Sequence, residues 1–334
     1  MPQRVIKIVL PSDQKEIALE MLDKQEHLSY WIEESTRANI IISSLIDSGY
    51  NEAVMDTFER KFGKIEGFRL IVFPVEAAIP REKVEDKPDV TAKTKKKKST
   101  RISREELYDD IVDSSKLNNI FIVMAVLSTV VVAVGLIKNN AAVIIGAMVI
   151  APFLGPNVAL ALSNVLADKK LGWDSFKTLL AGITIVLILS IGMGLFVGID
   201  PTIPEIASRT QPDLWDILLA LASGAAGVLA FTTGASAVVI GVMVAVALLP
   251  PLTVFGLLIG SGETTLATGA ILLFLTNIIC INLAGVTTFL LQGVSPRTWW
   301  EAKKAKKATR KSLAYWIITL ALLIFIMSLW SDKF

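Results

Sequence analysis

Hydrophobic and polar residues follow different patterns in the two parts of the chain. As far as about residue 115, short alternating or helically spaced apolar patterns are interrupted by charged residues, whereas apolar runs of about 18 or more residues recur beyond it. Runs of that length are long enough to cross the hydrocarbon core of a bilayer as helices. The pattern therefore predicts a polar amino-terminal domain followed by an α-helical polytopic membrane domain.

Residues 1–80 combine strand-like and helix-like patterns. Strands are predicted over 4–10, 28–34, 38–45 and 68–75, and helices over 12–25 and 50–62. The order β-α-β-β-α-β is that of a ferredoxin-like α/β domain, in which two helices cover one face of the sheet. Such a domain serves either as a docking or oligomerisation module or as a cytosolic sensor of a ligand, and both alternatives stay open.

Residues 81–102 lose hydrophobic periodicity and contain the run Lys95–Lys98, so they are predicted to be a solvated, Lys-rich linker. Consecutive lysines just ahead of a membrane span favour the cytoplasmic side and attract anionic lipids. Anionic lipids are therefore expected partners of this segment.

Residues 103–116 are predicted to form an acidic interfacial helix. Ser103 and Glu106 have the spacing of a capping box, and the apolar positions form one stripe. Like charges four residues apart repel one another unless a cation or a basic partner intervenes. The candidate cation or subunit contact consists of Glu106, Asp109, Asp110 and Asp113. The alternative is a hydrated acidic face with no ligand.

Seven membrane-spanning segments are predicted after this helix. They lie at about 119–137, 141–163, 176–198, 214–232, 236–260, 267–291 and 313–330. The membrane domain is accordingly divided into repeat 1 at 117–198, an extracytoplasmic loop at 199–213, repeat 2 at 214–292, a basic cytoplasmic loop at 293–312, and a seventh span with its tail at 313–334.

Basic residues predict the orientation of these spans. With the amino terminus in the cytoplasm, the loop that carries Lys169 and Lys170 and the basic loop 293–312 both face the cytoplasm, as the positive-inside rule requires. The chain is expected to be a multi-pass protein of the cell (cytoplasmic) membrane with an extracytoplasmic carboxyl terminus. In an alternative, the two proline-containing segments are re-entrant hairpins and five crossings remain, but the lysine loop then lies outside.

The membrane domain contains an internal duplication. Residues 142–162 (AVIIGAMVIAPFLGPNVALAL) resemble residues 237–257 (AVVIGVMVAVALLPPLTVFGL), about 95 residues later. Each copy is the second of three spans and is interrupted by proline and glycine near its middle. An odd number of crossings separates the copies, which predicts an inverted 3+3 repeat with a broken second helix in each repeat, as in many transporters.

The two breaks are the candidate permeation site. A proline within a helix removes an amide donor and clashes with the carbonyl one turn back, so backbone polar groups are freed at membrane depth and must meet protein, water or a ligand. The candidate permeation or substrate-binding residues are Pro152, Gly155, Pro156, Asn157, Pro250, Pro251, Thr253, Asn277 and Asn282. In the alternative, the prolines are tolerated kinks and the asparagines hydrogen-bond neighbouring helices.

Composition excludes several other classes of function. One cysteine and one histidine provide neither a disulfide framework nor a His/Cys metal site, and no cofactor is expected. No phosphate-binding loop of the GxxxxGK[ST] type is present, and no Asp, Glu, Lys, Arg or His lies deep in a predicted span. The net charge of +2 does not indicate a nucleic-acid partner. An enzyme, an ATP-driven pump and carboxylate-mediated proton coupling are therefore disfavoured.

The acidic segment that begins at Ser103, the segment IIGAMVIAPFLGP (144–156) and the segment VVIGVMVAVALLPP (238–251) together resemble the bacterial and archaeal membrane proteins grouped as domain of unknown function 389. The resemblance covers residues 100–290 well and the first domain more loosely. It implies the membrane architecture and carries no activity with it.

These observations favour a membrane transporter or channel for a small solute or ion, whose site lies where the two broken helices cross. The cytosolic domain is expected to regulate it, and small-residue runs such as 222–227 predict a homo-oligomer. The alternative is a membrane-anchored sensor or scaffold that assembles as an oligomer without transport.

Overall fold

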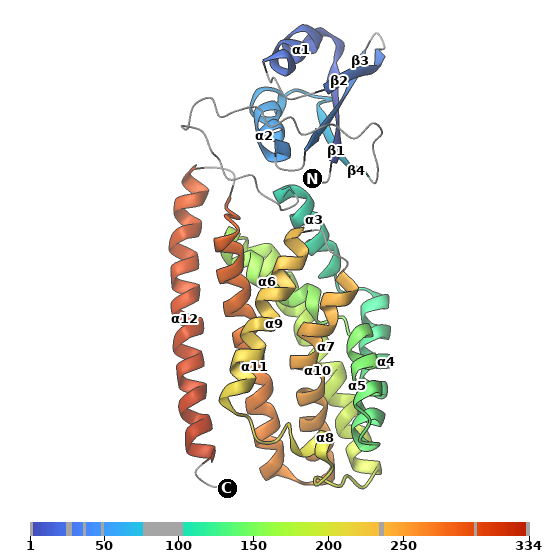
Figure 1. The fold of residues 1–334 in the computed structure, drawn as a ribbon, viewed down its shortest axis with the longest axis vertical. Helices are drawn as coiled ribbons and strands as arrows, with labels where there is room; N and C mark the ends of the chain where they lie inside the picture. Colours follow the sequence, from blue (N-terminus) through green and yellow to red (C-terminus); the bar gives the residue numbers. More distant parts are fainter. Residues whose placement is uncertain are drawn as a thin grey trace, which may run out of the picture. The chain divides into compact units, whose positions relative to one another are not determined.

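The computed structural model of the chain describes residues 3–24, 29–35, 38–47, 50–75, 103–233, 237–296 and 299–331 (Figure 1). It has two compact units, Met1–Glu106 and Leu107–Phe334. The boundary falls inside helix α3 (Arg104–Ser114). The predicted linker and its run Lys95–Lys98 lie outside the described residues.

The first unit is an α/β domain with the predicted order of elements. These are β1 (Gln3–Pro11), a 3₁₀ turn (Ser12–Gln14), α1 (Lys15–Asp23), β2 (Ser29–Ser35), β3 (Asn39–Asp47), α2 (Asn51–Phe62) and β4 (Arg69–Val75). The strands form an antiparallel sheet in the order β2-β3-β1-β4. This β-α-β-β-α-β order with β1 and β3 in the centre is that of a ferredoxin-like sandwich.

Strict alternation along β1 builds the core of this domain. Ile6, Ile8 and Leu10 are fully buried, and they belong to the same cluster as Phe58 and Phe62 of α2. The intervening residues of β1 are only partly buried because they lie on the opposite face of the sheet. One sheet face therefore supports the helices, as the sequence pattern predicts.

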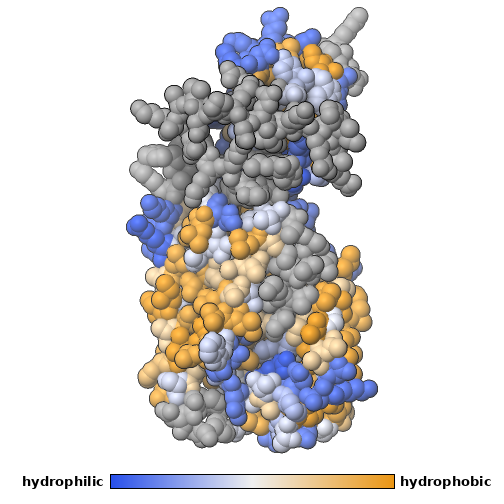
Figure 2. Space-filling view, viewed as in Figure 1, coloured by the Kyte–Doolittle hydropathy of each residue, from blue (hydrophilic) through white to orange (hydrophobic). Residues whose placement is uncertain are grey.

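The second unit is a bundle of helices, and the face seen in Figure 2 carries a broad hydrophobic band. The helices are α4 (Asn119–Ile137), α5 (Ala141–Ile150), α6 (Leu154–Leu166), α7 (Lys169–Phe196), α8 (Pro204–Ala207), α9 (Leu214–Thr233), α10 (Ala237–Ser261), α11 (Thr264–Leu291) and α12 (Trp299–Ser331). Within the described residues, five helices are long and apolar enough to cross a membrane, and the pair α5–α6, bent by 54°, makes a sixth. These helices indicate a membrane-embedded protein.

The largest differences from the predicted helices are two early starts and one missing break. Helix α7 begins at Lys169 rather than near residue 176, because the Asp168 side chain accepts hydrogen bonds from the amides of Lys170 and Leu171 and caps the helix. Helix α12 begins at Trp299, inside the predicted loop 293–312, since that segment is rich in alanine and lysine, which favour helices. Helix α10 runs without interruption through Pro250 and Pro251, so the predicted break is wrong there.

Helix α11 lies at the centre of the bundle, and 78% of its apolar 18-residue stretch is buried. Only 11% of the corresponding stretch of α12 is buried. Glycines lie in the contact between α7 and α10. A Cβ atom added to Gly194 or Gly260 would collide with backbone oxygens of the facing helix. The close α7–α10 contact therefore requires residues without side chains at these positions.

Contacts between the connecting segments group them at two ends of the bundle. At one end, the amide of Glu205 donates to Oδ1 of Asn139, and Gly269 packs against the carbonyl of Thr210. At the other end, Oγ1 of Thr309 in α12 donates to the carbonyl of Asn164 in α6. The connection between α6 and α7 therefore lies at the same end as the start of α12 (Figure 1).

Candidate functional site

The first proline-containing segment forms a true break. Helix α5 ends at Ile150, its cap Ala151 is extended, and α6 starts at Leu154. Pro156 is the third residue of α6, where a backbone amide has no partner within the helix, so the missing donor costs little. Gly155 packs directly on the backbone oxygen of Ser114, which leaves no room for a side chain.

The second proline-containing segment remains helical because a neighbouring helix replaces the missing donor. In an uninterrupted helix the amide of residue 251 would donate to the carbonyl of Ala247, and Pro251 has no amide hydrogen. Nδ2 of Asn277 in α11 donates to that carbonyl at 2.7 Å. Within α10, Oγ1 of Thr253 donates to the carbonyl of Leu249 at 2.9 Å.

A second buried contact joins α11 to α6. Nδ2 of Asn282 donates to Oδ1 of Asn157 at 3.3 Å and to the carbonyl of Ile278 at 2.9 Å. Nδ2 of Asn157 donates in turn to the carbonyl of Phe153, beside the break, at 2.8 Å. Both asparagines are fully buried. The chain thus forms a continuous run of hydrogen bonds from the α5–α6 break to the central helix.

Two carbonyl oxygens in this region lack a hydrogen-bond donor among the described residues. They are Oδ1 of Asn277 and Oδ1 of Asn282, and both residues are buried. Leaving a buried acceptor unpaired costs about 1–3 kcal/mol. A water molecule or a bound solute that donates hydrogen bonds, or a cation, would remove that cost.

The predicted site residues therefore meet on α11 rather than at a direct crossing of two broken helices. Asn277 connects α11 to α10 near Pro251, and Asn282 connects it to α6 near Pro156. The sequence-based prediction missed the backbone carbonyls of Phe153 and Ala247. Spacing along the sequence could have identified these two carbonyls, because each belongs to the residue one helical turn before a predicted site residue, Asn157 or Pro251.

The acidic residues of α3 make contacts of their own, although Ser114 of the same helix packs on Gly155. Glu106 pairs with Arg4 at 3.1 Å within the α/β unit, and Asp113 pairs with Lys116 at 2.6 Å. Asp109 and Asp110 are exposed. Among the described residues, no three His, Cys, Asp or Glu side chains gather closely enough to hold a metal ion. The candidate cation contact on this helix therefore has no support in the described structure.

Helix α3 instead makes a polar contact with the start of α7. Oη of Tyr108 donates to Oδ2 of Asp168 at 2.8 Å, while Oδ1 of the same carboxylate caps α7. Burial, and then the neighbouring Asp168, raise the pKa of Tyr108 to about 12. This contact fixes α3 at the end of the bundle where α6 and α7 are connected.

Comparison with known proteins adds a family relationship. Residues 148–283 match the family described as "Domain of unknown function (DUF389)". An uncharacterised protein of Methanocaldococcus jannaschii is 39% identical over 287 residues, which cover 86% of this chain and 86% of the relative. No solved structure matches the chain. The matched segment contains both proline-containing segments and all three buried asparagines described above.

Proposed function

The chain belongs to the DUF389 family of membrane proteins, and we propose that it is a transporter or channel for a small solute or ion. The observation that carries this proposal is on the central helix, where no donor among the described residues pairs with Oδ1 of Asn277 or Oδ1 of Asn282. Polar groups within a membrane must pair with protein, water or a ligand, and polar residues inside membrane domains mark the paths of solutes and ions.

The chemistry of these atoms narrows the class of solute. Both unpaired atoms are carbonyl oxygens, while the amide groups of Asn277 and Asn282 already donate to protein acceptors. The proposal therefore favours a cation or a neutral solute with N–H or O–H groups over an anion. A carrier that uses sodium bound by carbonyl oxygens, a facilitative carrier and a channel all fit this chemistry.

The proposal includes an orientation and an internal symmetry. The contact between Asn164 and Thr309 supports a common side for the exposed residues Lys169 and Lys170 of α7 and the basic start of α12, and the positive-inside rule assigns that side to the cytoplasm. The 33 residues of α12 span about 50 Å, which takes the carboxyl terminus to the opposite side. Within this arrangement we propose seven spans with an inverted repeat, an oligomer, and regulation by the α/β domain.

Flux through purified, reconstituted protein tests the proposal. Liposomes containing the protein are assayed for sodium and potassium flux with fluorescent indicators, and for urea and glycerol entry by light scattering. We expect a flux above that of empty liposomes for one of these probes. Asn282→Leu, which keeps the volume but removes the acceptor, should lower that flux about three- to tenfold, the loss of one hydrogen bond.

Asn164→Leu is the matched control. Asn164 also lies on an apolar helix, but within the described part of the chain its side chain donates to the carbonyl of Leu160 in its own helix. Its replacement should leave the flux unchanged. Equal flux in both variants would show that Asn282 does not line the path. If the folded protein transports none of the probes, the sensor or scaffold alternative is favoured.

A further inference from the structure

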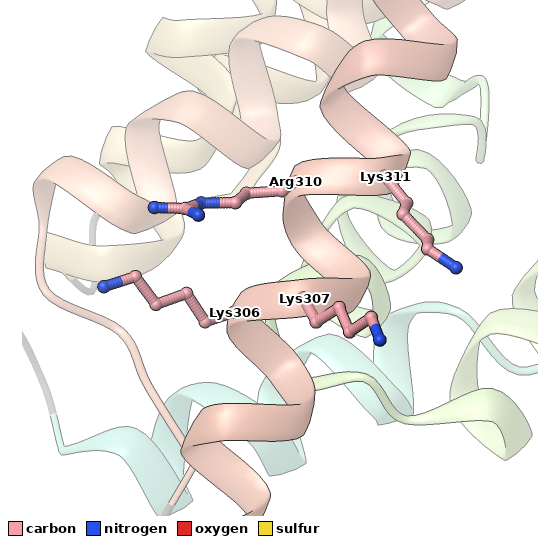
Figure 3. Close-up of a pocket in the computed structure, with 4 residues that line it drawn as sticks. All are labelled: Lys306, Lys307, Arg310 and Lys311. Atoms are coloured by element: carbon pink, nitrogen blue, oxygen red, sulfur yellow. The ribbon is translucent and has the colours of Figure 1, made fainter.

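The first turns of α12 carry a group of cations, Lys306, Lys307, Arg310 and Lys311, which we call the α12 basic cluster. These residues line a hollow of about 300 Å³. Figure 3 shows Lys306 and Arg310 extending to one side of the helix, and Lys307 and Lys311 extending to the other. The cluster thus presents two pairs of cationic groups.

The cluster concentrates positive charge that the described protein does not neutralise. Within each pair the two residues are four apart, a spacing at which like charges destabilise a helix. Among the residues whose side chains are described, no acidic group forms an ion pair with any of the four. An anion bound between the side chains would relieve this repulsion.

The packing of α12 on α6 determines which way the α12 basic cluster faces. Ala305 and Thr309 are 2% and 5% exposed, and Oγ1 of Thr309 donates to the carbonyl of Asn164 at 3.1 Å. The α6-facing side of the helix is therefore occupied, and Lys306, Lys307, Arg310 and Lys311 remain at the surface or close to it.

Aromatic residues mark the level of the membrane surface at this point. Tyr315, 64% exposed, follows Lys311 by one helical turn and lies edge-on to Trp316 with ring centroids 5.7 Å apart. Tyrosine and tryptophan concentrate at the headgroup level of bilayers. A span that enters the hydrocarbon core after these aromatic residues would put the basic cluster at the depth of the lipid phosphates.

We propose that the α12 basic cluster binds the phosphate groups of anionic lipids in the leaflet at this end of the bundle. The guanidinium of Arg310 suits bidentate contact with a phosphate, and the lysines reach the headgroups from the helix surface. A soluble anion or a nucleic acid fits less well, because the cluster directly adjoins an apolar span and its aromatic residues. This proposal rests neither on the run Lys95–Lys98 nor on the proposed transport activity.

Native mass spectrometry of the purified full-length protein tests this proposal. The protein in detergent is mixed with equal amounts of palmitoyl-oleoyl phosphatidylglycerol and the corresponding phosphatidylcholine, and the retained lipids are counted. Wild type should retain the anionic lipid in preference to the zwitterionic one. Replacement of all four cluster residues by glutamine should reduce that preference about tenfold or more, given the attraction that each lost charge contributes.

The matched control removes the same kinds of charge, in the form of three exposed lysines and one exposed arginine, from the α/β domain. The control variant replaces Lys24, Arg60, Lys61 and Lys64 with glutamine. It should keep the wild-type lipid preference. Circular dichroism spectra of both variants establish that the helices are retained.

Two results would overturn the proposal. One is an equal lipid preference in the wild type and in the cluster variant. The other is complete displacement of the anionic lipid by millimolar inorganic phosphate, because that would identify the cluster as a site for a soluble anion rather than for lipid headgroups.

Discussion

Pro251 and Asn277 act as a pair, since one removes a donor from α10 and the other supplies it from α11. The carbonyl of Ala247 is buried, and its hydrogen bond to Nδ2 of Asn277 is short at 2.7 Å. Asn277→Ala should therefore lower the free energy of unfolding by about 1 kcal/mol, toward the upper part of the range for hydrogen bonds between membrane helices. Equilibrium unfolding of the protein in mixed micelles by increasing amounts of sodium dodecyl sulfate measures this difference.

A double-mutant cycle separates this hydrogen bond from the other contacts of Asn277. Pro251→Ala restores an amide hydrogen that can bond to the carbonyl of Ala247. In that background the cost of Asn277→Ala should fall by more than half. An unchanged cost would mean that Asn277 stabilises the bundle by packing rather than by replacing the proline's missing donor.

Tyr108 predicts a stability change at high pH. The pKa of its phenol is raised from an ordinary value of 10.0 to about 12, so the protein favours the neutral form. The stabilisation from this group is fully present below about pH 10 and is lost as the pH rises through about 12. Between these values, the difference in melting temperature between wild type and Tyr108→Phe should shrink. A constant difference would show that the phenolic hydrogen bond to Asp168 does not contribute.

At the scale of elements, the contact between α7 and α10 depends on individual glycines rather than on glycine content. A Cβ atom on Gly194 would collide with the carbonyl of Leu257, whereas a Cβ on Gly192 of the same helix meets nothing within 4 Å. Gly194→Ala should therefore destabilise the protein by about 1–3 kcal/mol through overpacking. Gly192→Ala should be neutral or stabilise by up to about 1 kcal/mol.

The same unfolding measurement in detergent compares the two variants, and Gly192→Ala controls for the altered helix propensity. If both substitutions lower the free energy of unfolding by the same amount, the two helices must separate easily. The close packing of α7 on α10 would then contribute little to stability.

Hydropathy predicted the helices well because their length is set by the membrane rather than by tertiary contacts. Helix α4 has the predicted bounds, and the other apolar helices start or end within a few residues of the predicted spans at most of their boundaries. The starts of α7 and α12 differ because polar caps and charged, helix-favouring residues extend a helix beyond its apolar part. Apolar length alone does not contain that information.

The local sequence could not predict that α10 continues through its two prolines. Proline rules consider only donors in the same helix, and the donor that compensates Pro251 lies on another helix. The contact between Asn157 and Asn282 likewise joins residues 125 positions apart. The sequence therefore indicated which polar residues lie in the apolar part of the chain, whereas their partners emerged only from the packing of α6, α10 and α11.

For the whole molecule, the proposed inverted repeat predicts the sidedness of equivalent positions. In a Cys280→Ser background, cysteines placed at Asn140 and Ala235 should react with an impermeant thiol reagent from opposite sides of membrane vesicles. Cysteines at Lys170 and Lys307 should react from one common side, because Asn164 and Thr309 hold these segments together. The labelling of intact and opened vesicles distinguishes the sides.

Same-side labelling of residues 140 and 235 would contradict the inverted repeat and favour a parallel or re-entrant arrangement. Opposite labelling of residues 170 and 307 would contradict the placement of α12 itself. The two pairs therefore test the symmetry and the bundle independently.

The hydrogen bond between Asn277 and the carbonyl of Ala247 also has a consequence for evolution. A proline at position 251 is tolerated only while position 277 supplies a donor, and a donor there is needed less once residue 251 has its own amide hydrogen. Substitutions at these two positions should therefore appear together in related sequences. In lineages that lose the proline, α10 no longer needs a donor from position 277, so the proposed solute path is the remaining constraint on that residue.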